Sequence, residues 1–560
     1  MTFLWSSLQN KLLLGFFSLL VCTLLVLGWQ GYRSARAELR TLTFQHLKTI
    51  RETKKFEIEQ YFKDLHSRCL SMSESLMTIE AMNAFKKAFF EIDVDPETLE
   101  RYTQDLKAFY EKDFLPKVNE TATTTKKLDD FFPEDPKTIV LQTLYLAHNP
   151  NPLAKKSEFS KASDDSAYSR LHAQYHDIFL QYTKRFGYFD IYLVDIDTGH
   201  VVFNISKEID FATNLITGPL KDTGLAKTFN ALQKTTNRSF VQLTDFDFYE
   251  PSYGVPSAFI GTPIYQGNTK IGCLIFELPI NVINNIMTYD KQWQEVGLGD
   301  TGETYIIGHD KLMRTISRFF VEDKQTYINK LRALHVNGDI IDKMHIYKTT
   351  ILLQEITGNA GDDVIQGNTN TRIDSDYLQE ISLSSYTPLT IQDVQWYLIA
   401  EIDLSEAFAP IKKLSWHILV LTLLILIAVM ILAVFLIGVI LKPLHTIITH
   451  MTQPFISFKE KIPVQSSDEA AIIADYFNKI GQEIGNAIYT IHLADNQLAQ
   501  ALQHTTEKLQ TLSTSIEEEA FLSAEIKEQL MQHINELITV HKQCQDLEKQ
   551  LHDTIERTDL

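Results

Sequence analysis

Residues 416–441 read WHILVLTLLILIAVMILAVFLIGVIL, a stretch without a single charged side chain. An α-helix needs about 20 apolar residues to cross a hydrocarbon core of ~30 Å, and this stretch is longer. The buried helix of a soluble protein is the alternative, but such a helix normally carries a polar stripe. Lys442 and Pro443 follow, a base that can reach the lipid headgroups and a proline suited to the first turn of a new helix. The stretch therefore predicts a transmembrane helix that divides the chain.

A second apolar run, residues 12–29, lies near the N-terminus behind Lys11. A cleaved signal peptide is the alternative, but its only small-residue cleavage pattern, Ala35-Arg36-Ala37, lies too far beyond the run and contains an arginine. We expect an uncleaved anchor, with residues 1–11 in the cytoplasm and residues 30–410 outside. Flanking charge does not decide the orientation, because the positive-inside rule applies to short loops.

The composition excludes several classes of function. The chain has 560 residues and a formal net charge of −19, which argues against a nucleic-acid partner. Its four cysteines form no disulfide framework, and we expect Cys69 and Cys273 to be buried as small apolar residues. The usual motifs of metal, phosphate and nucleophile sites are missing, so we expect neither an enzyme nor a cofactor.

The segment outside the membrane changes its periodicity along the chain. From Glu38 to about Leu76 apolar residues recur at helical spacing, which predicts a long amphipathic helix. From Tyr188 the period becomes two, and hairpin turns separate the apolar runs. Expected strands lie at residues 188–195, 200–204, 239–243, 257–265, 270–277, 303–307, 349–355, 383–386 and 396–401. This order predicts an α+β fold with two antiparallel sheets in series, each with its own core.

Six stretches of this segment resemble, in order, the extracellular double-Cache domain of bacterial transmembrane sensors. They are 141–152 (LQTLYLAHNPNP), 168–176 (YSRLHAQYH), 186–215 (FGYFDIYLVDIDTGHVVFNISKEIDFATNL), 247–264 (DFYEPSYGVPSAFIGTPI), 297–314 (GLGDTGETYIIGHDKLMR) and 396–410 (WYLIAEIDLSEAFAP). The resemblance implies a long N-terminal helix carrying two PAS-like subdomains, a distal one at about 80–290 and a proximal one at about 291–410. It also implies a small-molecule pocket in the distal subdomain.

Alternation along the first strand places Tyr188, Asp190 and Tyr192 on one face, and the other face is expected to be core. A carboxylate beside two phenols is costly to bury unless something pairs with it. With four residues from later segments they form our candidate ligand site for an amino acid or a carboxylate. These four are Lys207, Asp210, Tyr249 and Ser252. The alternative is that Asp190 forms a structural ion pair and the tyrosines are ordinary strand residues.

Two other groups of polar residues contain side chains that can bind a metal ion. His172 and His176 are four residues apart and would share a helix face, but no matching carboxylate or third histidine is evident, so solvated or hydrogen-bonded histidines are expected. Residues 300–303 (DTGE) are interpreted as a structural turn into the second sheet.

The segment after the apolar stretch resembles a HAMP domain at 442–490. Pro443, Asp468-Glu469 and Phe477-Asn478 are the matching residues. The resemblance implies a parallel four-helix bundle in a homodimer. From Ile484 apolar residues recur at alternating spacings of three and four, so we expect a coiled coil over 491–560. A bend or an antiparallel hairpin near Glu517–Glu519 remains the alternative to one continuous helix.

Together these features predict a multi-pass receptor of the bacterial inner membrane that is not itself an enzyme. Its outer domain would bind a small molecule and signal through HAMP and coiled coil to a separate cytoplasmic protein. Two rivals stay open: the sensor part of a kinase or phosphatase system without its catalytic domain, and an envelope scaffold built on the coil.

Overall fold

The computed structural model describes residues 8–120, 122, 124–451, 469–491, 508, 511 and 524–558. The chain divides into two compact units. One is Tyr32–Leu414, and the other combines Met1–Gly31 with Ser415–Leu560. The candidate site lies in the first unit.

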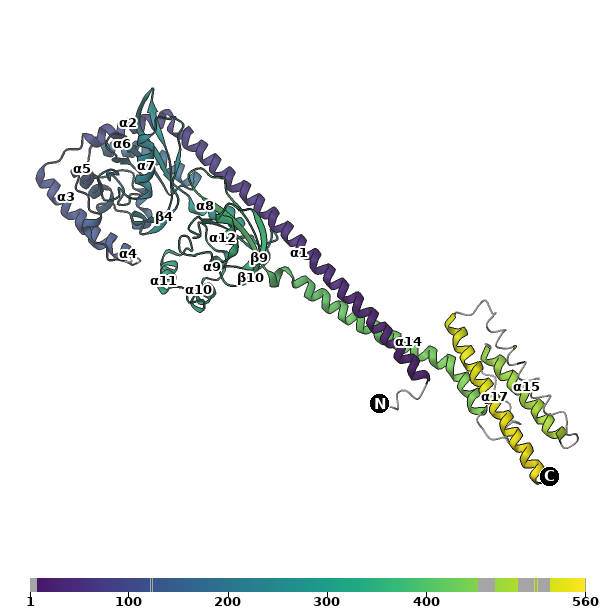
Figure 1. Cartoon of the computed structure of the whole chain (residues 1–560). Helices are drawn as coiled ribbons and strands as arrows, with labels where there is room; N and C mark the ends of the chain where they lie inside the picture. Colours follow the sequence, from purple (N-terminus) through teal and green to yellow (C-terminus); the bar gives the residue numbers. More distant parts are fainter. Residues whose placement is uncertain are drawn as a thin grey trace. The chain divides into compact units, whose positions relative to one another are not determined.

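Helix α1 (Leu8–Ser73) confirms the long N-terminal helix. Ile58, Phe62, Leu65 and Cys69 are buried at spacings of four and three, so one stripe of the helix faces the rest of the unit. This part of α1 passes beside both sheets (Figure 1). The helix therefore connects the two halves of the unit by direct packing.

A group of shorter helices precedes the first sheet. They are α2 (Leu76–Phe90), α3 (Pro96–Phe109), α4 (Leu115–Asn119), α5 (Pro136–Gln142) and α6 (Ala167–Phe186). Asp95 and Asp135 each cap a helix whose first residue is proline, the residue that needs no hydrogen bond there. Gly187 ends α6 in the left-handed conformation at φ 77°, where a glycine avoids strain.

The first sheet is antiparallel, with strand order β2-β1-β7-β6-β3. Its strands are β1 (Asp190–Asp195), β2 (Val201–Phe203), β3 (Gln242–Leu243), β6 (Phe259–Gln266) and β7 (Thr269–Glu277). Helix α7 (Gly224–Lys234) packs on one face. A separate ribbon of β4 (Asp247–Tyr249) and β5 (Val255–Ser257) follows β3, and α8 (Ile280–Thr288) leads to the second sheet.

The second sheet is also antiparallel, with strand order β8-β11-β10-β9. Its strands are β8 (Glu303–Gly308), β9 (Asn370–Ser375), β10 (Ile381–Pro388) and β11 (Trp396–Asp403). Four helices lie between β8 and β9: α9 (Arg318–Glu322), α10 (Lys324–Ala333), α11 (Gly338–Tyr347) and α12 (Asn359–Ile365). The mixed helix and antiparallel-sheet fold is as predicted.

Two details of the second sheet differ from the prediction. Residues 349–355 were expected to form a strand, but they make turns, with Leu352 at φ 59°. The apolar side chains of these turns are buried in the core. A run of apolar residues indicates burial, but it does not distinguish a strand from a packed loop. The true edge strand, β9, was missed because its sequence NTRIDS is largely polar and partly exposed.

Each sheet has a hydrophobic cluster of its own, and in addition the two sheets share a core. One hydrophobic cluster runs from α1 and the first sheet to Trp396 and Leu398 of β11. The rings of Phe62 and Trp396 meet edge to face with centroids 5.4 Å apart, and Phe246 stacks on Trp396 at 5.7 Å. Trp396 also donates its indole N–H to Asp245, whose carboxylate receives two hydrogen bonds from Arg314. We call these five residues the Trp396 joint.

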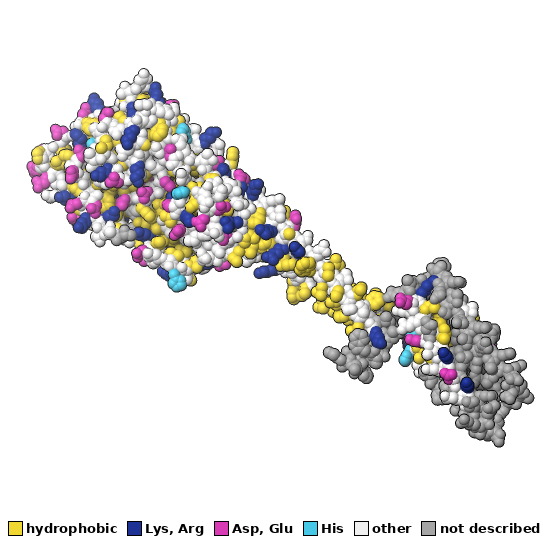
Figure 2. Space-filling view, viewed as in Figure 1, with side chains coloured by type: hydrophobic (Ala, Val, Ile, Leu, Met, Phe, Trp, Pro, Cys, Tyr) yellow, Lys and Arg dark blue, Asp and Glu magenta, His cyan; other side chains and the backbone are white. Residues whose placement is uncertain are grey.

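Two helices of the described chain are long and apolar enough to cross a membrane. These are α1, in its N-terminal part, and α14 (Ala409–Met451), which follows α13 (Leu404–Ala407). The outward surface of this apolar stretch is hydrophobic (Figure 2). Contrary to expectation, Pro443 starts no new helix, because α14 continues through it. The exposed apolar side chains of α14 and the long helix favour the membrane assignment.

The C-terminal part contains α15 (Glu469–Ile491) and α17 (Ala524–Thr558). Ile473, Phe477, Ile534 and Leu537 are buried within the chain. The expected HAMP connector at 452–468 and most of the heptad stretch between Ile491 and Ala524 lie outside the described residues. HAMP bundle, coiled coil and dimer therefore stay predictions.

Candidate functional site

The candidate site is a group of buried carboxylates at one end of the first sheet. Asp190 at the start of β1 is the direct cross-strand partner of Glu277 at the end of β7. Tyr192 is two residues further along β1, so strand alternation places its side chain on the same face as Asp190. Asp210 and Glu208, from the segment after β2, complete a set that we call the acidic cluster: Asp190, Glu208, Asp210 and Glu277.

Asp190 is fully buried, yet only one of its oxygens has a partner. Its Oδ1 accepts hydrogen bonds from the backbone N–H groups of Ile191 and Ile205, both at 2.7 Å. Its Oδ2 has no hydrogen-bond partner among the described residues. An unpaired buried carboxylate oxygen is costly, so this atom is the first candidate for contact with a ligand.

Asp210 is held by two tyrosines and one amide. The hydroxyls of Tyr192 and Tyr249 donate to its Oδ2 at 2.9 and 2.8 Å, and Asn204 Nδ2 donates to its Oδ1 at 2.9 Å. Tyr192 also lies 3.2 Å from Glu277 Oε2. The Oδ1 atom of Asn204 is buried without a hydrogen-bond partner among the described residues. Asn204 Oδ1 and Asp190 Oδ2 are thus two acceptors without a donor.

Lys207 is the only basic side chain that the sequence placed in this site. Its backbone has a φ of 56°, and its Nζ donates to the carbonyls of Asn204 and Ile205 at 3.2 and 3.0 Å. Nearby, Ser252 donates its hydroxyl to Glu208 Oε2 at 2.6 Å. An ammonium group has three protons, so two bonds to carbonyls leave Lys207 able to make one more.

Burial shifts the pKa of every charged group here towards the neutral form. Burial, reinforced by Asp210, raises the pKa of Asp190 to about 7, while two backbone N–H groups and Lys207 oppose the rise. Burial lowers the pKa of Lys207 to about 7 against the attraction of Asp190. Burial likewise raises the pKa of Asp210 and Glu277. Burial therefore disfavours the ionised carboxylates, which a cation bound beside them would stabilise.

These shifts give the unliganded protein a testable pH dependence. A carboxyl whose folded pKa is raised contributes stability that is complete at low pH and is lost as pH rises through the folded value. Asparagine at position 190 cannot ionise, so we expect Asp190→Asn to gain stability over the wild type as pH rises from 5 to 7.5. The gain is on the order of 1.4 kcal/mol for each unit of displacement.

Lys207 acts in the opposite direction at higher pH. Its unfolded form keeps the proton that the folded form loses near pH 7, so its contribution to stability rises between pH 7 and 10. Thermal unfolding of the full chain in nanodiscs between pH 5 and 9 measures both trends. A constant difference between wild type and Asp190→Asn over pH 5–7.5 would contradict the assigned shift.

The structure brings six of the seven predicted ligand residues into one region. Asp190, Tyr192, Asp210 and Tyr249 belong to one network, and Lys207 and Ser252 border it. Tyr188 is on the wrong face: its ring stacks on Phe276 at 4.5 Å, in the core that α1 covers. The strand begins only at Asp190, so alternation does not extend back to Tyr188. A role in ligand binding remains a prediction for the other six.

Sequence reasoning missed Glu208, Glu277 and Asn204. Glu208 is adjacent to Lys207 in the sequence and was within reach of the same argument. Glu277 joins the site only through the register of β1 with β7, which pairs residues more than eighty positions apart. The pattern of residues within one strand does not predict which residue of a distant strand lies opposite it.

The second sheet repeats part of this arrangement. Glu303 and Glu401 are cross-strand partners, and Tyr305, two residues after Glu303, donates its hydroxyl to Glu401 at 3.0 Å. Here the protein itself supplies partners for the carboxylates: Tyr377 and the N–H of Arg318 bond Glu303, and Ser384 bonds Glu401. Unpaired acceptors thus distinguish the first sheet's cluster from the otherwise similar second one.

The two histidines and the turn at 300–303 form hydrogen bonds within the chain, although Nε2 of His172 is buried without a hydrogen-bond partner among the described residues. The ring of His172 contacts the Ser160 carbonyl at 2.6 Å and that of His176 the Ser157 carbonyl at 2.8 Å. The carboxylate of Glu406 accepts hydrogen bonds from the backbone N–H groups of Asp300 and Thr301, as a structural turn requires. The described residues contain no group of three or more histidine, cysteine or acidic side chains placed to hold a metal ion.

No protein-family model matches the chain, and no curated protein matches it. Among solved structures it is similar to ligand-binding domains of bacterial chemoreceptors. One is Pseudomonas fluorescens CtaA in complex with L-serine, at 12% identity, covering 54% of this chain and 93% of that chain with a TM-score of 0.24.

Two others are amino acid chemoreceptors of Pseudomonas aeruginosa PAO1. PctB in complex with L-Arg matches at 12% identity, covering 57% of this chain and 91% of that chain with a TM-score of 0.26. PctC in complex with GABA matches at 10% identity, covering 39% and 74% with a TM-score of 0.23.

Proposed function

We propose that the protein is a non-catalytic transmembrane receptor whose outer domain binds a small metabolite through a protonated amino group. The observation that carries this proposal is the unpaired Oδ2 of Asp190, fully buried among other carboxylates. A ligand ammonium group would donate hydrogen bonds to that oxygen and to Asn204 Oδ1. The same contact would stabilise the ionised form of Asp190.

The charge balance of the site favours an amine over a plain carboxylate. Four carboxylates form the acidic cluster, whereas two lysines bring positive charge to it, Lys207 beside Asp190 and Lys156 near Glu208. An anion bound at this cluster would raise the free energy needed to ionise each buried carboxylate. A bound cation would lower that free energy. Of the two ligand classes expected from the sequence, an amino acid therefore fits better, with its carboxylate directed to the remaining proton of Lys207.

Transmission to the cytoplasm completes the proposal. Strand β11 leads through α13 into α14, so the second sheet is covalently continuous with one of the two candidate membrane spans. We propose that a homodimeric HAMP unit and a parallel coiled coil carry the change onward to a separate signalling protein. The proposed location is the bacterial inner membrane, with the domain of 30–410 outside.

The test is a ligand screen on the full chain in nanodiscs, read by thermal unfolding. The panel contains amino acids, primary amines of the same size, and carboxylates without an amino group. A ligand at 100 times its dissociation constant adds about 2.7 kcal/mol to stability, so true ligands raise the melting temperature clearly. We expect hits among the compounds with an amino group.

Two outcomes would contradict the proposal. Hits confined to carboxylates without an amino group would reject the assigned ligand chemistry. A folded protein that responds to no compound would favour the envelope scaffold.

A further inference from the structure

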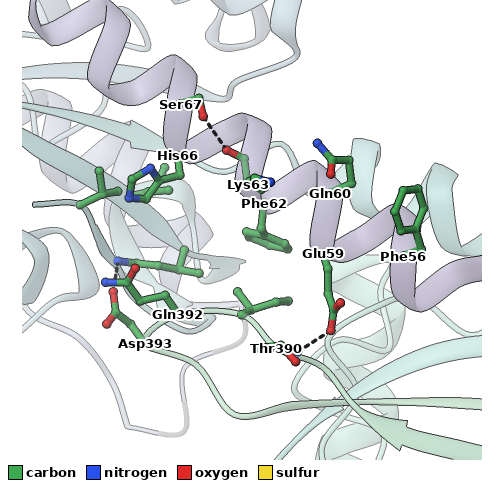
Figure 3. A pocket seen from close by; sticks show the side chains of 14 residues that line it. Phe56, Glu59, Gln60, Phe62, Lys63, His66, Ser67, Thr390, Gln392 and Asp393 are labelled. Atoms are coloured by element: carbon green, nitrogen blue, oxygen red, sulfur yellow. Dashed lines mark hydrogen bonds between the residues drawn. The ribbon is translucent and has the colours of Figure 1, made fainter. Parts of the chain in front are cut away.

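A cavity that is separate from the acidic cluster lies between α1 and the two sheets. It has a volume of about 630 Å³. Its lining comes from α1, from strands β3 and β6 of the first sheet, and from the segment between β10 and β11 of the second. Figure 3 shows α1 crossing over the segment that holds Thr390, Gln392 and Asp393, with Phe62 projecting from the helix. The cavity is thus lined by residues of the long helix, of the first sheet and of the segment between two strands of the second sheet.

The floor of the cavity is apolar. Phe62, Leu243 and Ile260 are nearly fully buried in the structure, and Ile391 packs beside them. A cavity of this size lies within the range of roughly 300–1,000 Å³ typical of small-molecule sites, which combine such an apolar floor with a few polar groups.

The two acidic residues at the rim of the cavity already accept hydrogen bonds from the backbone. Glu59 accepts a hydrogen bond from the backbone N–H of Thr390 at 2.7 Å, and Asp393 accepts one from the N–H of Leu243 at 3.1 Å. Lys63 and His66, one turn apart on α1, also line the cavity. No side-chain hydrogen bond or ion pair holds either of them within the described part of the chain. The side chains at the rim that remain available to bind a ligand are therefore the basic ones, Lys63 and His66.

We propose that this cavity binds a small amphiphilic carboxylate, with its apolar body on Phe62, Leu243 and Ile260 and its carboxylate at Lys63 and His66. The combination of an apolar floor with uncommitted donors at one side suits an anion with an apolar tail and disfavours the amine taken by the acidic cluster. This cavity is thus a second site of opposite charge preference.

The position of the cavity gives its ligand a regulatory effect. Phe62 belongs to both the cavity lining and the Trp396 joint, and Ile391 is five residues before Trp396. A bound carboxylate would contact α1, the edge strand β3 of the first sheet and the segment before β11 of the second sheet at the same time. It would therefore favour one arrangement of the two sheets, independently of whether the acidic cluster is occupied.

The test uses radiolabelled 4-phenylbutyrate and equilibrium dialysis of the full chain in nanodiscs, with empty nanodiscs subtracted. We expect saturable binding of one molecule per chain. Because Lys63 would supply the charged donor for the carboxylate, Lys63→Gln should raise the Kd about tenfold or more. Lys48→Gln, an exposed lysine of α1 outside the cavity, is the matched control and should leave the Kd unchanged.

Three further measurements separate the alternatives. 4-Phenylbutylamine, which has the same apolar body and the opposite charge, should not compete; competition by it would overturn the proposal. Asp190→Asn should bind 4-phenylbutyrate as the wild type does, so failure at the acidic cluster and failure here are distinguishable. Ile391→Trp, confirmed as folded by its melting temperature, should fill the cavity and abolish binding.

The remaining outcomes would reject the site. Binding that does not saturate above the empty nanodisc, or that is equal in Lys63→Gln and wild type, would exclude it. A change in oligomeric state in Lys63→Gln, measured by light scattering, would instead mark the surface as an interface between two copies of this chain.

Discussion

Asp190→Asn is expected to weaken binding of an amine ligand by roughly 30-fold or more while the unliganded protein stays folded. Removing one partner of a buried charged pair costs about 2–5 kcal/mol, and a tenfold change in affinity corresponds to about 1.4 kcal/mol. Asparagine keeps an Oδ1 that can accept from Ile191 and Ile205, so the two backbone bonds survive. Only the charge and the acceptor at Oδ2 are lost.

The second sheet supplies the matched control for this substitution. Glu303 is also fully buried, opposite a second glutamate, and burial raises its pKa to about 7. Its carboxylate is already bonded by Tyr377 and Arg318, so Glu303→Gln should leave the ligand Kd unchanged. Isothermal titration of both variants with a hit from the screen gives the comparison.

The same experiment exposes the structural alternative for Asp190. If Asp190 formed an internal ion pair, its removal would destabilise the unliganded domain by about 3–5 kcal/mol. A melting temperature of Asp190→Asn that collapses at pH 7.5, with or without ligand, would mean that the residue holds the sheet together. The ligand site would then lie elsewhere.

Trp396→Ala is expected to cost about 3–5 kcal/mol, the largest loss of stability among single substitutions in the Trp396 joint. Trp396 is 1% exposed and contacts Phe62 of α1 and Phe246 in the segment between β3 and β4. Its removal leaves a cavity where the two sheets and the long helix meet. It also deprives Asp245 of one hydrogen-bond donor.

A conservative variant separates packing from hydrogen bonding at this position. Trp396→Phe retains a ring against Phe62 and Phe246 but lacks the indole N–H, while Arg314 still bonds Asp245. We expect it to lose much less stability than Trp396→Ala, about the 0.5–1.5 kcal/mol of one hydrogen bond plus the smaller ring. Thermal unfolding of both variants in nanodiscs measures the difference. Equal losses would show that the hydrogen bond, rather than ring packing, maintains the joint.

The sequence alone determined the features that depend on local periodicity. The apolar stretch of 416–441, the stripe of Ile58, Leu65 and Cys69 on α1 and the hairpins of the first sheet all follow from spacing and turn residues. It also predicted that Asp190 and Tyr192 share a face and that the segment with Lys207 and Asp210 lies nearby. These inferences succeed because each concerns residues within a few turns or one hairpin of one another.

Features that depend on the pairing of distant segments are visible in the three-dimensional fold and not in the local sequence. The register of β1 with β7 sets Glu277 opposite Asp190, and the bend before Asp190 turns Tyr188 to the other face. The packing of α1 against both sheets adds a shared hydrophobic cluster to the two cores expected from the length of the segment, and it leaves the cavity at Lys63. Strand register and helix docking are set by side chains far apart in the sequence, so no local pattern contains them.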